Sequence, residues 1–186
     1  MRFILGIAAI ALAAACTPAA TTQTAATSGC QAAATETWTP ADGADPLTIE
    51  ANSSGPDCAH AIATLTVRDA SNDVMFTDVF VTEQVMLLAG VPDAAAMQTA
   101  LAEWIDSDRQ TFATSAALPD WPQGAESPDA GEFPLHVDDT LNRANYLALR
   151  SRGVPTLCYV QGMESLNCLA LENDLLTPIG IQQFPG

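Results

Sequence analysis

The sequence predicts an α+β domain, with an antiparallel sheet of about four to six strands and one or two helices packed on one face. Residues 61–67 and 74–81 alternate apolar and polar side chains, and residues 155–171 have the pattern of a hairpin. Residues 92–107 carry apolar side chains at helical spacing instead. Strands joined by short turns pair antiparallel, and an amphipathic helix needs a sheet face on which to bury its apolar stripe.

The turn between the two alternating segments, residues 69–73, consists of residues that favour hairpin turns. Its oxygen-bearing side chains also resemble the start of a calcium-binding loop. That loop requires glycine where Val74 stands and glutamate where Phe80 stands, so a hairpin is the prediction here. Another short strand is expected at residues 47–51, where apolar and polar residues alternate as well.

Two helices are expected. The first, residues 92–107, begins with proline, which suits the first helical position. Its apolar stripe consists of Met97, Leu101, Trp104 and Ile105. The second, residues 138–152, has Asp138 as a candidate cap at its start and Gly153 just beyond its end.

The hairpin predicted over residues 155–171 places Cys158 opposite Cys168. With these cysteines facing each other the register centres on Met163 and leaves a three-residue Gly-Met-Glu loop, an ordinary hairpin length. Met163 at the tip is therefore a candidate for a binding surface. The tail, residues 178–184, could add one more strand.

Residues 115–137 contain four prolines and two glycines, which predicts a long loop. Loops of this length in a compact domain are either functional or mobile. Trp121 is its conspicuous side chain. It either fixes the loop to the core or forms an exposed tip, and we retain it as a second candidate for a binding surface.

The chain begins with Met1-Arg2, followed by an uncharged segment from Phe3 to Ala15 and then by Cys16. This segment has the length of a signal-peptide core and is shorter than the roughly 20 residues that span a bilayer. A cysteine directly after small residues resembles the lipobox of bacterial lipoproteins, although Ala13 stands where leucine is more common. An ordinary signal peptide with a chance cysteine is the alternative. The resemblance implies cleavage after residue 15 and lipidation of Cys16, with palmitate-type acyl chains.

The same resemblance implies where the protein resides. Thr17, in place of the aspartate that signals inner-membrane retention, implies the outer membrane, with the protein facing the periplasm. We therefore expect a signal peptide over residues 1–15, a Thr/Ala-rich tether over residues 16–36 and a single α+β domain over residues 37–186. The anchor would be stable because each buried methylene contributes about 0.8 kcal/mol.

Four further cysteines would lie in an oxidising compartment, which favours disulfides. Three pairings are possible, and sequence proximity favours Cys30 with Cys58 and Cys158 with Cys168. A zinc site is not expected, because the chain has no C-x-x-C motif and its two histidines are His60 and His136. We expect no metal and no cofactor.

The charge is strongly acidic: 22 Asp and Glu residues face six basic ones, all of them arginine. Nucleic acid is therefore not expected as a partner, because phosphates would be repelled. The absence of lysine excludes Schiff-base chemistry and lysine-containing phosphate loops. The acidity serves solubility or attracts a cationic protein partner.

Catalysis is not expected. Ser165 with His60 or His136 could form a triad only through the fold, since no G-x-S-x-G motif occurs. Three hypotheses remain: a non-catalytic envelope lipoprotein that binds or supports another component, an inhibitor of a basic wall-degrading enzyme, and an uncharacterised hydrolase. The second is similar in plan to the membrane-anchored lysozyme inhibitors, but those use a serine and lysine loop and this chain has no lysine.

Overall fold

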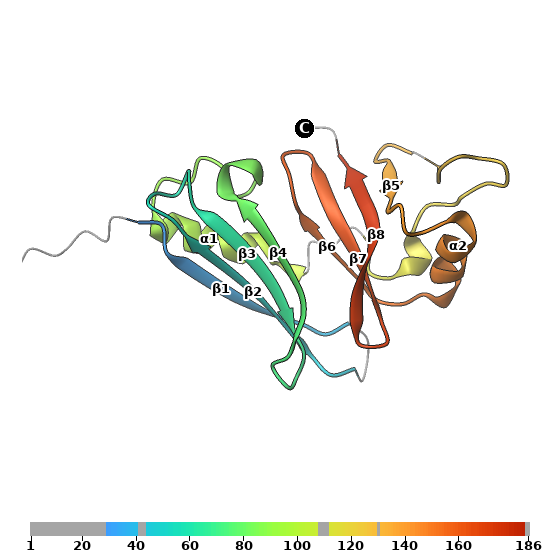
Figure 1. Ribbon diagram of the computed structural model, residues 1–186, viewed down its shortest axis with the longest axis horizontal. Coiled ribbons are helices and arrows are strands. Elements are labelled where there is room, and N and C mark those ends of the chain that lie inside the picture. Colours follow the sequence, from blue (N-terminus) through green and yellow to red (C-terminus); the bar gives the residue numbers. More distant parts are fainter. Residues whose placement is uncertain (1–28, 41–43, 108–111, 130, 185–186) are drawn as a thin grey trace, which may run out of the picture.

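The computed structural model describes residues 29–40, 44–107, 112–129 and 131–184. The predicted signal peptide, Cys16 and most of the predicted tether lie outside these residues. The described chain forms two antiparallel four-stranded sheets and two α-helices (Figure 1). The predicted α+β class is confirmed, and the strands are divided between two sheets instead of forming a single one.

The first sheet contains β1 (Ala32–Trp38), β2 (Leu47–Ser54), β3 (Ile62–Arg68) and β4 (Val74–Val81), in that spatial order. The second contains β5 (Leu135–Val137), β8 (Leu175–Gln183), β7 (Ser165–Glu172) and β6 (Thr156–Val160), again in spatial order. The helices are α1 (Ala94–Trp104) and α2 (Arg143–Arg152), with short 3-10 helices at η1 (Thr82–Gln84) and η3 (Ser115–Ala117).

One face of the first sheet is apolar because alternate residues of its central strands point the same way. Ile49 and Leu65 are buried there under α1, which packs on β1 and β2. The helix begins at Ala94, two residues later than predicted, because Asp93 is its N-cap and accepts a 2.9 Å hydrogen bond from the Ala96 N–H. Its buried side chains are Met97, Ala100, Leu101 and Trp104.

Strand β1 begins earlier than the predicted domain boundary at residue 37. It starts at Ala32, inside the range expected to be tether, and pairs along its whole length with β2. Alanine and threonine give this strand the composition of a linker, but Ala34 lies opposite Ala51 and packs against the core. Pairing with a neighbouring strand therefore decides the structure here, and composition does not.

The second sheet is built on the predicted hairpin. Cys158 lies opposite Cys168, as predicted. Strand β8 begins at Leu175, earlier than predicted, after a two-residue turn in which Asn173 (φ 50°) and Asp174 (φ 60°) both have positive φ. Such turns match the twist of antiparallel strands.

Helix α2 is shorter than predicted. Asp138 does not cap it but accepts hydrogen bonds from Thr140 in a separate turn, and Asn142 is the N-cap. The predicted end is confirmed, since Gly153 (φ 60°) closes the helix in a left-handed conformation. Tyr146 and Leu149 are the buried residues of α2, in a core shared with the second sheet.

The two sheets share the larger core. Leu157, Tyr159 and Leu169 of the second sheet belong to the same buried cluster as Ile49 and Leu65 of the first. The Trp104 indole N–H also donates a 2.6 Å hydrogen bond to the Val160 carbonyl, which ties α1 to β6. Within the described ranges, no helix has the length and apolar character required to cross a membrane.

Candidate functional site

Trp121, one of the two candidates for a binding surface, packs against the protein itself. Its side chain is half-buried, and its ring meets that of Tyr146 edge-on with centroids 5.4 Å apart. Its indole N–H donates to the Ala125 carbonyl at 2.9 Å, and its own carbonyl accepts from the Arg143 guanidinium. Trp121 therefore holds the long loop against α2.

Met163, the other candidate, lies at the tip of the β6–β7 hairpin and is 53% exposed. The neighbouring Gly162 carbonyl accepts a 3.1 Å hydrogen bond from the Met86 N–H, which links the hairpin tip to the segment that follows β4. Met86 is itself exposed. Trp121 and Met163 thus belong to different elements, and the structure does not bring them together.

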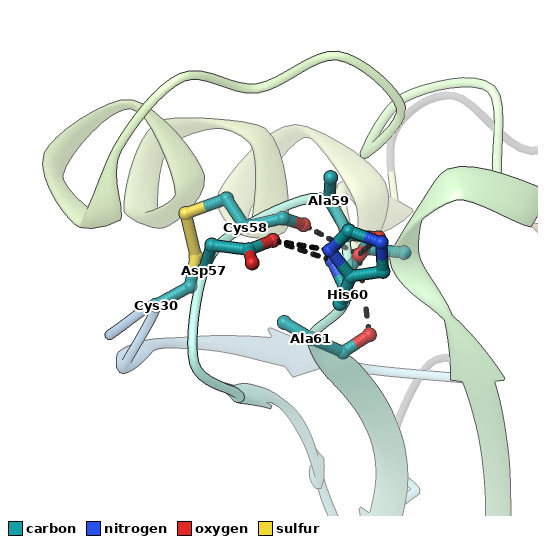
Figure 2. Close-up of polar contacts among 7 residues, drawn as sticks. Cys30, Asp57, Cys58, Ala59, His60 and Ala61 are labelled. Atoms are coloured by element: carbon teal, nitrogen blue, oxygen red, sulfur yellow. Dashed lines mark hydrogen bonds and ion pairs between the residues drawn. A yellow bond between two sulfur atoms is a disulfide. The ribbon is translucent and has the colours of Figure 1, made fainter. Parts of the chain in front are cut away.

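His60 lies in the loop before β3, beside the disulfide between Cys30 and Cys58 (Figure 2). Its Nδ1 atom is 2.8 Å from the Asp57 carboxylate, and its backbone N–H donates to the same oxygen at 2.9 Å. The side-chain hydrogen bond to Asp57 raises the pKa of His60. The backbone and side-chain hydrogen bonds from His60 lower the pKa of Asp57.

Among the described residues, no hydroxyl or thiol side chain is hydrogen-bonded to this acid–base pair. The neighbouring hydroxyl, that of Thr82, is buried and donates to backbone carbonyls, with the Cys58 carbonyl closest at 2.6 Å. The other predicted triad members lie in the second sheet, with His136 on β5 and Ser165 on β7. Strand β8 separates those two strands.

Both predicted disulfides are confirmed: Cys30 is bonded to Cys58, and Cys158 to Cys168. The first links the segment before β1 to the loop before β3, and the second joins facing strands of the hairpin. No group of three or more metal-ligating side chains is found in the described part of the chain.

A groove lies where turns from both sheets meet, and we call it the turn-end groove. It has a volume of about 530 Å³ and lies between the β3–β4 turn, the β7–β8 turn, Pro40 and residues 44–47. Figure 1 shows these turns at the same end of the two sheets. The apolar side chains that line it are Leu47, Met75 and Leu171, and the carboxylates are those of Asp45, Asp69 and Asp174.

The less exposed part of the turn-end groove, which we call its floor, is apolar, and the exposed part, which we call its rim, is acidic. Met75 and Leu171 are half-buried, whereas Asp45 and Asp174 are exposed. Two large apolar side chains lie exposed beside the turns, Val74 at 55% and Leu175 at 58%. Exposed apolar side chains near a concave surface are typical of a site that contacts a ligand or another protein.

Hydrogen bonds hold the first of these turns in shape. One Asp69 carboxylate oxygen accepts from the backbone N–H groups of Ser71 at 2.9 Å and of Asp73 at 2.8 Å. Arg68, which precedes this turn, is 2.9 Å from the Glu50 carboxylate and also donates to the Asn72 carbonyl. No basic residue lines the groove among the described residues.

Two other hollows of similar size are weaker candidates for a binding site. One of about 420 Å³ between α2 and the second sheet includes Arg152 and Glu172, which pair with each other. Another of about 470 Å³ lies at the start of α1, between Asp57 and Asp93. Each of these two carboxylates already accepts a backbone hydrogen bond from its own loop or helix.

Comparison with protein-family models, with curated proteins and with solved structures finds no match for this chain. A functional proposal therefore depends on the chemistry of its residues and on the arrangement that the fold gives them.

Proposed function

We propose that this protein is a lipid-anchored binding module of the bacterial cell envelope. In this proposal it is cut before Cys16, lipidated there and held at the outer membrane facing the periplasm. It contacts a partner protein and catalyses no reaction. The observation that carries the binding role is the turn-end groove; Val74 and Leu175, which directly follow its two turns in sequence, are exposed.

A preformed groove favours binding because little chain has to be ordered when the partner arrives. The β3–β4 turn is fixed by the Asp69 carboxylate, and the β7–β8 turn is the shortest kind of hairpin connection. The volume of about 530 Å³ lies within the ~300–1,000 Å³ typical of ligand sites.

The direction of β1 supports an anchored role. This strand starts at Ala32, on the side where the chain enters the domain, and ends at Trp38 near the turn-end groove (Figure 1). At roughly 3.3 Å per residue, these seven residues separate the two ends by about 20 Å. The Cys30–Cys58 disulfide fixes the entry point, so the chain enters the domain at the opposite end of β1 from the groove.

A second candidate is an inhibitor of a basic wall-degrading enzyme. It is favoured by the three carboxylates of the groove and by the excess of acidic residues in the whole chain. Surface plasmon resonance against a basic lysozyme tests it, since an acidic surface steers a basic partner most strongly at low salt. Absence of binding at low salt rejects the inhibitor and leaves the general binding role in place.

The anchor is tested by metabolic labelling with a fatty acid, followed by separation of membrane and soluble fractions. The wild-type protein should incorporate the label and sediment with membranes, whereas Cys16→Ser should do neither. Equal labelling of both proteins would contradict lipidation of Cys16.

The binding role is tested by cross-linking intact envelopes and recovering the protein with its partner. We expect Ser71→Trp, which places a bulky ring in the groove, to reduce recovery of that partner at least fivefold. Asn145→Trp is the matched control, because Asn145 is exposed in the hollow beside α2. Equal recovery with both variants would exclude the groove as the binding site.

The hydrolase hypothesis remains open to a direct assay. Turnover of an ester, peptide or glycan that disappears on replacing His60, His136 or Ser165 would overturn the proposal of a non-catalytic module. The proposal is supported by the separation of these residues: β8 lies between the strands that carry His136 and Ser165, and His60 precedes β3 of the other sheet.

A further inference from the structure

The chemistry of the turn-end groove indicates what kind of segment occupies it, and this inference rests on the binding role proposed above. The apolar part of the groove is formed by Leu47, Met75 and Leu171. Leu47 is 5% exposed and belongs to the core, while Met75 and Leu171 are half-buried. The methionine side chain is flexible and can adapt to the shape of a partner. The floor can therefore accommodate aliphatic groups of different shapes.

The rim selects the charge of the occupant. Asp45, Asp69 and Asp174 come from three separate parts of the chain and converge on the groove without a basic residue among the side chains that line it. An acidic segment would be repelled by them and a basic one attracted. Asp45 and Asp174 are exposed, so they remain hydrated until the partner arrives.

The described chain does not supply the missing cation itself. Its four arginines bond elsewhere: Arg68 to Glu50, Arg150 to Asp120, Arg152 to Glu172, and Arg143 to the Trp121 carbonyl. Within the described ranges, no arginine therefore neutralises the carboxylates of the groove, and they present negative charge to the solvent.

We propose that the turn-end groove binds a segment of a basic protein in which an arginine or lysine lies next to an apolar residue. The aliphatic stem of the basic side chain lies over Met75 and Leu171, and its charged end reaches the carboxylates at the rim. Long basic side chains bury their stems in this way while the charge stays near water. Val74 and Leu175, which are exposed and follow the two turns in sequence, are available to the neighbouring apolar residue of the partner.

The experiment measures binding of short peptides to the full mature protein in detergent at low and high salt. The first peptide alternates arginine with leucine, the second arginine with glycine, and the third glutamate with leucine. We expect the first to bind at least tenfold more tightly than either of the others. Raising the salt from about 20 to 300 mM should weaken this binding severalfold.

The variants locate the site. Replacing Asp45, Asp69 and Asp174 together by asparagine removes three charges while asparagine at position 69 keeps an acceptor for its turn, and affinity should fall at least tenfold. Changing Glu103, Glu126 and Asp139 to the corresponding amides removes the same charge elsewhere on the surface. This control should change affinity less than threefold.

The possible failures are distinguishable. Equal loss in both triple variants would overturn the proposal in favour of a general charge effect. Equal binding of the arginine–glycine and arginine–leucine peptides would overturn the apolar contact, and no binding of either at low salt would overturn a basic occupant. In each case, capture of a partner from envelopes that depends on position 71 would still support the binding role.

Discussion

The Tyr159 hydroxyl donates a 2.7 Å hydrogen bond to the Asp78 carboxylate, and this contact joins β6 of the second sheet to β4 of the first. Asn167 donates to the same hydroxyl at 2.9 Å, and the Tyr159 ring packs near Trp104 and Phe80. Met75 of β4 lines the turn-end groove from the first sheet, and Leu171 of β7 with Asp174 of the following turn lines it from the second. The contact between Tyr159 and Asp78 therefore helps to fix the position of the first sheet relative to the second, and with it the shape of the groove.

Tyr159→Phe should destabilise the protein. A hydrogen bond to a charged group contributes about 1.5–3 kcal/mol, and the variant leaves the Asp78 carboxylate without this donor. Urea unfolding should show the free energy of unfolding lowered by that amount. A double-mutant cycle with Asp78→Asn isolates the pair, and additive effects of the two changes would show that they do not interact.

Both tyrosines of the chain should resist ionisation. Burial raises the pKa of Tyr146 to about 12, and burial together with the hydrogen bond to Asp78 raises the pKa of Tyr159. The ordinary value is 10.0, so both groups stabilise the fold below pH 10, and this contribution is lost as the pH rises through the folded-state pKa. Absorbance at 295 nm should show little phenolate at pH 10.5, and half-ionised tyrosine there in the folded protein would refute this.

His60 should titrate above its ordinary pKa of 6.5, because the Asp57 carboxylate accepts a hydrogen bond from its ring. The stabilisation from this pair is complete below pH 6.5 and is lost as the pH rises through the raised pKa. NMR titration checks the shift, with His136→Gln used to assign the signals. In Asp57→Asn the pKa should return toward 6.5, and an unchanged value would assign the shift to another group.

The two disulfides should differ in their contribution to stability. They close loops with sequence separations of 28 for Cys30–Cys58 and 10 for Cys158–Cys168. The chain-entropy relation gives roughly 3.6 and 2.7 kcal/mol for loops of these lengths. Replacing both cysteines of a pair by alanine and measuring the urea midpoint should therefore show the larger loss for Cys30–Cys58. The reverse order would show that packing outweighs loop closure.

Local signals explain what could be predicted from the sequence. The register of Cys158 with Cys168 follows from a hairpin whose strands and turn lie within one short segment. The start of α1 was predicted two residues too early, at Pro92, because Asp93 is the N-cap and the helix begins at Ala94. The start of β1 at Ala32 was missed because its alanines and threonines have the composition of a linker, and the strand depends on pairing with β2.

The turn-end groove could not be predicted in the same way. Asp69 was recognised as a turn residue, and the turn at Asp174 carries residues that favour positive φ. Nothing local indicates that these two turns lie at the same end of the molecule, because their positions depend on how the sheets pack through Tyr159 and Trp104. Acidic turn residues in separate hairpins were the available signal, and only the fold brings them together.

The most direct test of the account places a photo-cross-linking side chain at position 71, in the groove, in living cells. We predict an adduct with a basic protein at this position and none at position 145, which is exposed on α2. The adduct should disappear when Asp45, Asp69 and Asp174 are changed to asparagine. An adduct at position 145 alone, or one at position 71 that persists in the triple variant, would contradict the account.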